Sequence, residues 1–111
     1  MITYDVHLNH DNIDSALYNL DIYIKHAKKE KDKFLLFISG YGSSGKSHKI
    51  KDVIISKLEE YKNKKYIKDY ILGEEVKNLS IKYLEFLKNI KSDISENVIK
   101  CLNIGNILIK V

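Results

Sequence analysis

The sequence predicts a small α/β sandwich with a mostly parallel sheet of four strands. Four short segments are apolar or alternate between apolar and polar residues, as strands do. In the longer segments between them, apolar residues recur at three and four positions, as on one face of a helix. The two kinds of segment follow one another along the chain, which is typical of α/β proteins. In such sheets, ligands bind outside the carboxyl ends of the strands.

The first part of the chain predicts strand, helix and strand. Residues 2–8 alternate between apolar and polar side chains and suit a strand. Asp11 or Asn12 can cap the amphipathic helix that follows. The lysine-rich segment 28–33 suits a solvated helix end, where cations favour the helix dipole. Phe34–Ile38 contains five consecutive apolar residues and suits a strand buried on both faces.

The second part predicts a further helix and two more strands around a less regular segment. Apolar spacing supports a helix up to the turn at 62–65, and residues 66–72 alternate as a strand does. Serine caps favour helices over about 81–89 and 96–102. Residues 107–111 read as the final strand.

Composition and length limit the number of domains and the class of protein. The 111 residues suit one domain, 1–111. The formal charge of +4 permits nucleic-acid binding without requiring it. All 19 residues counted as lysine or arginine are lysine, so lysine is abundant throughout the chain. The number of lysines is therefore weak evidence for a function, and their positions are more informative. A single cysteine, Cys101, and no window of about 18 apolar residues indicate a soluble cytoplasmic protein without a membrane span.

The glycine-rich segment after the central strand predicts a phosphate-binding site. A strand, a flexible turn and a helix start leave several backbone N–H groups available to an anion. Lys46 and Lys49 lie near that helix start, where they oppose the dipole, and a bound anion would remove this conflict. Tyr41, between two glycines, can stack a base or pack against the turn. The predicted binding residues are Ser39, Gly40, Tyr41, Gly42, Ser43, Ser44, Gly45, Lys46 and Lys49.

Asp5 and His7 form a second candidate group at the end of the first strand. They are two residues apart and therefore share one face. His7 can move a proton near neutral pH, and Asp5 can orient it or hold a divalent metal such as Mg²⁺. The alternative is that both are a polar rim that caps the next helix.

The segment Gly40–Ser47 also matches the phosphate-loop pattern G-x-x-x-x-G-K-[ST]. A nucleotide hydrolase also needs a later apolar strand that ends in an acidic residue for magnesium. The final strand carries lysine there, and Asp69 is a weak substitute. The motif is therefore interpreted as a phosphate-binding turn, and a nucleotide binder is the least favoured alternative.

With these motifs in place, the chain resembles the Smr (small MutS-related) domain family. Tyr4-Asp5-Val6-His7 is similar to that family's Leu-Asp-x-His motif, and Ser39-Gly40-Tyr41-Gly42 is similar to its His-Gly-x-Gly motif. Residues 42–51, 67–74 and 103–109 add matches in the expected order, so the resemblance covers almost the whole chain.

The resemblance implies a two-layer α/β sandwich, similar to the C-terminal domain of bacterial translation initiation factor three. It also implies nucleic-acid binding, and some members nick DNA or cut RNA, including messenger RNA on stalled ribosomes. Asp5 and His7 match the family's acidic and histidine positions. Ser39 stands where the family usually has histidine, and serine does not titrate near pH 7. Two functions follow: an endonuclease of RNA or DNA, or a module that binds nucleic acid or the ribosome without chemistry.

Overall fold

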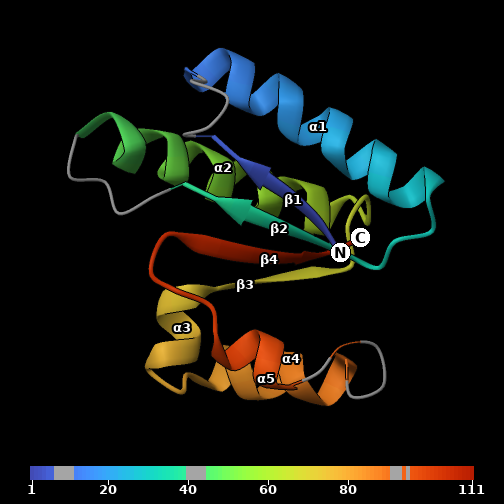
Figure 1. Cartoon of the computed structure of the whole chain (residues 1–111), viewed down its shortest axis with the longest axis vertical. Coiled ribbons are helices and arrows are strands. Elements are labelled where there is room, and N and C mark those ends of the chain that lie inside the picture. The colour runs from blue at the N-terminus through green and yellow to red at the C-terminus, as the bar shows by residue number, and fades with distance from the viewer. Residues whose placement is uncertain (7–11, 40–44, 91–93, 95) are drawn as a thin grey trace.

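The computed structural model describes residues 1–6, 12–39, 45–90, 94 and 96–111. Within these residues the chain forms four strands and five helices (Figure 1). In chain order they are β1 (Ile2–Asp5), α1 (Ile13–Lys29), β2 (Phe34–Ile38), α2 (Gly45–Asn63), β3 (Asp69–Leu72), α3 (Gly73–Lys77), α4 (Ile81–Ile90), α5 (Glu96–Lys100) and β4 (Asn106–Lys110). None of the described helices is both long and apolar enough to cross a membrane.

The four strands form one mixed sheet in the order β1-β2-β4-β3. Among neighbouring strands only β1 and β2 pair in parallel, whereas β4 pairs antiparallel with both β2 and β3. The prediction of a mostly parallel sheet is therefore wrong. The reason lies in the segment between β3 and β4. It forms helices that bring the chain back to the edge where β3 ends, since Leu72 pairs with Ile107, and β4 must then run in the opposite direction.

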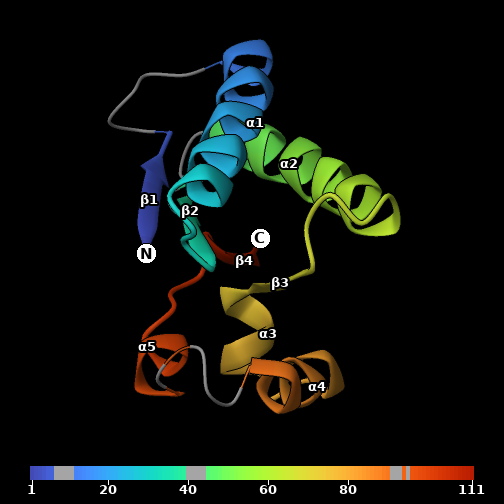
Figure 2. The same ribbon diagram turned by 90° about the vertical axis from the view of Figure 1, so that its right-hand side faces the viewer.

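Helices cover both faces of the sheet (Figures 1 and 2). Helices α1 and α2 pack on one face through Leu20, Ile24, Ile54 and Leu58, and α3, α4 and α5 pack on the other through residues that include Val76, Phe86 and Ile99. The two-layer arrangement implied by the family resemblance is therefore wrong for this chain, which has three layers.

The central strands supply apolar residues to both layers. In β2, Leu35 and Phe37 belong to the core beneath α1 and α2, whereas Phe34 belongs to the opposite core. In β4, Ile107 and Ile109 face the first core and Leu108 the second. The prediction that residues 34–38 form a strand buried on both faces is confirmed, because successive residues of a strand point to opposite faces.

Several element boundaries differ from the predicted ones: β1 ends at Asp5 instead of residue 8, α5 ends at Lys100 instead of residue 102, and β4 spans Asn106–Lys110 instead of 107–111. Strand β3 begins at Asp69 instead of residue 66, because the Tyr66 and Ile67 N–H groups donate to the Tyr61 carbonyl at the end of α2 and so cannot join the ladder. Helix α3 was not predicted. It begins at Gly73, where an added Cβ would lie 1.9 Å from the Asn103 carbonyl oxygen, so glycine permits this close approach.

The start of α1 agrees with one of its two candidate caps. The Asn12 side chain accepts a hydrogen bond from the Ser15 N–H at 2.8 Å, and the Asn12 N–H donates to Ser15 Oγ at 2.9 Å. This reciprocal pair is a capping box. Asp11 lies outside the described residues.

Candidate functional site

The ends of β1 and β2 lie side by side at one edge of the sheet. Asp5 pairs with Ile38 in the parallel register, and the Val6 N–H donates to the Ile38 carbonyl at 3.1 Å. The half-buried Asp5 is therefore next to the strand end from which the glycine-rich segment leaves. The sequence predicts this proximity from a parallel β1 and β2, and that pair is parallel.

Several predicted site residues lie outside the described part of the chain: His7, Gly40, Tyr41, Gly42, Ser43 and Ser44. Gly45 and Lys46 are described through the backbone of α2, whose first residue is Gly45. Lys49 is exposed on the same helix. The first turn of α2 contains no acidic residue of its own that would offset the positive end of the helix dipole. The phosphate site stays a prediction.

Ser39 directly follows β2 and is completely buried. Its N–H and its hydroxyl both donate to the Gly105 carbonyl, each at 2.9 Å. These two hydrogen bonds connect the end of β2 to the turn that precedes β4. Gly105 lies in this turn with a φ of 93°. The hydroxyl is therefore engaged with the backbone inside the protein, in the position where the resembled family usually has histidine.

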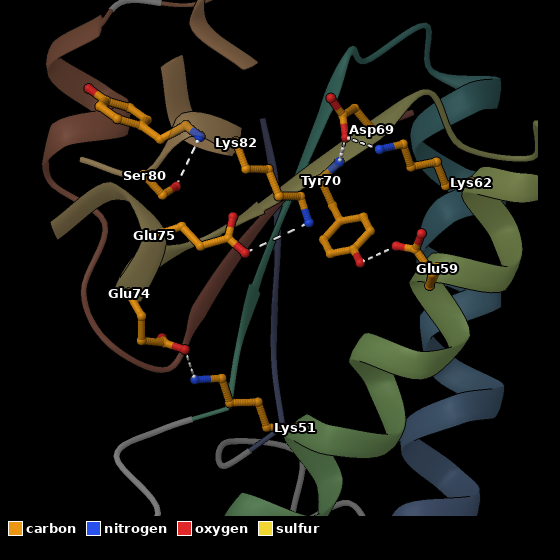
Figure 3. A network of polar contacts seen from close by, with 10 residues as sticks. Lys51, Glu59, Lys62, Asp69, Tyr70, Glu74, Glu75, Ser80 and Lys82 are labelled. Atoms are coloured by element: carbon orange, nitrogen blue, oxygen red, sulfur yellow. Dashed lines mark hydrogen bonds and ion pairs between the residues drawn. The ribbon is translucent and has the colours of Figure 1, made fainter. Parts of the chain in front are cut away.

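Glu74 and Lys51 extend this arrangement, and sequence reasoning gave neither of them a role. The Gly105 N–H donates to Glu74 Oε1 at 3.2 Å, and Lys51 Nζ donates to Glu74 Oε2 at 2.5 Å (Figure 3). One carboxylate thus joins α2, α3 and the start of β4. Lys51 and Glu74 are 23 positions apart on different elements, so no local pattern in the sequence marks this contact.

The environment keeps Glu74 in its charged form. Burial raises the pKa of the Glu74 carboxyl, but hydrogen bonds from Lys51 and from the Gly105 N–H outweigh burial and lower the pKa below its usual value of 4.5. Lys51 is nearly buried, with 13% of its side chain exposed. The pair therefore forms an ionic contact next to the contact between Ser39 and Gly105.

The structure also bears on the nucleotide-binding alternative. Asp69 begins β3 and pairs with Lys110, whereas the glycine-rich segment follows Ile38, which pairs with Asn106 at the other end of β4. The Asp69 carboxylate contacts Lys62 Nζ at 3.2 Å instead (Figure 3). Asp69 therefore lies at the wrong end of the sheet to hold magnesium beside residues 40–47.

Asp5 is a predicted ligand of a divalent metal. Among the described residues, no group of three or more histidine, cysteine, aspartate or glutamate side chains could hold a metal ion. Asp5 is the predicted ligand that the structure describes at this edge, and His7 lies outside the described residues.

We also compared the chain with known proteins. Comparison with protein-family models, with curated proteins and with solved structures found no match for this chain.

Proposed function

We propose that this chain is an Smr-type nucleic-acid-binding domain that holds backbone phosphates at the edge formed by the ends of β1 and β2. The observation that carries the proposal is the parallel register that makes Asp5 the partner of Ile38. Both motif segments, the one that contains Asp5 and the one that follows Ser39, leave the sheet from neighbouring positions. An antiparallel β1 would have put Asp5 at the far end of the sheet.

The charge at the start of α2 supports a phosphate as the ligand. Lys49 is exposed and the first turn of this helix has no acidic residue. Cations near a helix start oppose the dipole by about 0.3–1 kcal/mol each, and a bound phosphate would reverse that penalty. Binding of a nucleic-acid backbone should therefore weaken as the salt concentration rises.

Endonucleolytic cleavage is the activity proposed for this edge, with Asp5 and His7 as the catalytic residues. His7 would transfer a proton to or from the reacting oxygens of a phosphodiester, and Asp5 would orient that imidazole. A divalent ion such as Mg²⁺, held by Asp5, would supply charge stabilisation at the phosphate.

A non-catalytic nucleic-acid or ribosome-binding module is the second candidate, and the position of Ser39 favours it. The Ser39 hydroxyl is buried and donates to the Gly105 carbonyl, so it does not replace the histidine of the resembled family. Cleavage would then depend on His7 alone.

Binding is tested with fluorescently labelled single-stranded RNA and with duplex DNA over a range of salt concentrations. We expect Lys49→Gln to weaken binding and to lower the slope of log affinity against log salt by about 0.7–0.9, the contribution of one phosphate contact. Lys77→Gln, an exposed lysine of α3, is the control of equal charge. Equal effects of the two substitutions would refute a phosphate contact at α2.

Cleavage is tested separately on labelled single-stranded RNA and on supercoiled plasmid, with magnesium or with EDTA. If the chain is an endonuclease, His7→Ala and Asp5→Asn abolish a cut that the wild type makes. His7→Ala also controls for contaminating nuclease. Salt-sensitive binding without any cleavage would leave the non-catalytic module as the function.

A further inference from the structure

A basic pocket of about 260 Å³ lies at the opposite end of the sheet from Asp5 and Ser39. We call it the lysine pocket, because its lining includes Lys28, Lys31, Lys33, Lys68 and Lys110. Both chain ends lie on this side of the molecule, toward the right in Figure 1. In the sheet register Phe34 pairs with Lys110, whereas Ile38 pairs with Asn106. The length of β2, about 15 Å, therefore separates the pocket from the candidate nucleic-acid edge.

The lining of this pocket contains five lysines and one acidic side chain. Asp32 is the acidic side chain in its lining, and its carboxylate already contacts the Met1 ammonium at 3.4 Å. Val111 also lines the pocket, and even with a terminal carboxylate at Val111 the lysines outnumber the negative groups. Within the described residues, neither Lys31 nor Lys68 has an acidic side chain within ion-pair distance.

Two of the ammonium groups donate hydrogen bonds to backbone carbonyl groups. Lys28 Nζ donates to the Tyr66 carbonyl and lies 4.0 Å from the centre of the Tyr66 ring. Lys110 Nζ donates to the Asn89 carbonyl at 3.0 Å. The contacts of Lys28 with Tyr66 fix its ammonium position without cancelling its charge. The pocket therefore presents positioned cations to an anion.

The lysine-rich composition does not by itself explain this cluster. Many lysines elsewhere on the described surface contact carboxylates: Lys25 with Asp21, Lys51 with Glu74, Lys57 and Lys64 with Glu60, Lys62 with Asp69, and Lys82 with Glu75. At the lysine pocket, three segments of the chain, around residues 28–33, 68 and 110, bring five lysines together with one acidic side chain. This gathering of lysines around one pocket indicates a site for an external anion.

We propose that the lysine pocket binds the phosphate groups of a polyanion, at a site separate from the edge that carries Asp5. Several ammonium groups around so small a volume suit a ligand with dense negative charge, and lysine is a common phosphate-binding residue. The phosphates belong either to a nucleic-acid backbone or to a small phosphorylated molecule. The proposal does not depend on nucleic-acid binding at the ends of β1 and β2.

The test is an NMR titration of the ¹⁵N-labelled full chain with inorganic tripolyphosphate and, separately, with a single-stranded oligonucleotide. We expect the amide signals of Lys31, Lys33, Lys68 and Lys110 to shift. Shifts with tripolyphosphate alone identify a small phosphorylated ligand, and shifts with the oligonucleotide alone identify a nucleic-acid backbone. Because Lys49 and Asp5 report on the other edge, failure of either site is seen independently.

The variant Lys31→Asn/Lys68→Gln provides the functional half of the test. Both residues are exposed, and asparagine tolerates the φ of 56° found at Lys31, so the fold should be kept. We expect about a tenfold loss of tripolyphosphate affinity, from two exposed charge contacts. The matched control, Lys77→Gln/Lys100→Gln, removes two exposed lysines outside the pocket and should change affinity by less than about twofold. No shift of the four pocket amides, or an equal loss in both variants, would overturn the proposal.

Discussion

Ser39 contributes to the fold, although it lies at a motif position where the resembled family usually has a histidine. Its N–H and hydroxyl converge on the carbonyl oxygen of Gly105, 66 positions further along the chain. A motif comparison finds serine where histidine is usual and indicates a lost proton-transfer group. The contact with Gly105 depends on the return of β4 to the same edge, which no pattern around Ser39 contains.

Substitution of Ser39 separates these two roles. Ser39→Ala removes the hydroxyl but keeps the N–H bond to Gly105, so the free energy of unfolding should fall by about 0.5–1.5 kcal/mol. Ser39→His places a larger ring at a position with no exposure and should cost about 2–3 kcal/mol. Urea unfolding followed by circular dichroism measures both. If Ser39→His were as stable as the wild type, the position would have room for the family's histidine.

At the scale of elements, the sequence predicts best what depends on neighbours along the chain. The five apolar residues of β2 predict its bounds correctly, and Asn12 was one of two predicted caps of α1. Helix α3 and the start of β3 depend on distant partners, namely the backbone of Asn103 beside Gly73 and the Tyr61 carbonyl. Neither partner is identifiable from local spacing, so these parts of the fold could not be predicted.

The contact of α2 with α3 through Lys51 and Glu74 should make stability depend on pH. The pKa of Glu74 is lowered in the folded state, so its contribution is fully present above about pH 4.5 and is lost as the pH falls through the folded-state pKa. At pH 7, Glu74→Gln should lower the free energy of unfolding by about 1.5–3 kcal/mol, the value of a hydrogen bond to a charged group. This difference should shrink as the pH falls below about 4.5.

The control for that experiment is Glu85→Gln, which removes the same charge from an exposed position on α4. Chemical unfolding at several pH values gives the free energy of each variant. A Glu74→Gln effect that stays constant between pH 7 and pH 3 would show that the carboxylate charge does not stabilise this contact.

At the scale of the whole molecule, the order of elements predicts an α/β protein but not the number of layers. Helices α4 and α5 were expected from serine caps, yet their spacing does not reveal which face of the sheet they cover. The direction of β4 and the position of these helices are coupled, because the chain leaves β3 and enters β4 at the same edge. The direction of β4 matters less for the proposed nucleic-acid-binding edge. That edge is formed by the ends of β1 and β2, which are parallel as predicted.

The three layers share one sheet, and this predicts that both cores unfold in a single transition. Ile54 packs on one face of the sheet and Ile99 on the other, and both are completely buried. Ile54→Val and Ile99→Val each remove one methylene group and should lower the free energy of unfolding by about 0.5–1.5 kcal/mol. Because the sheet separates the two sites, the effects should add in the double variant.

If the two cores unfold together, urea unfolding followed by circular dichroism and by tyrosine fluorescence should give coincident curves. Two separate transitions, with Ile99→Val shifting only one of them, would instead show that α3, α4 and α5 unfold independently of the rest.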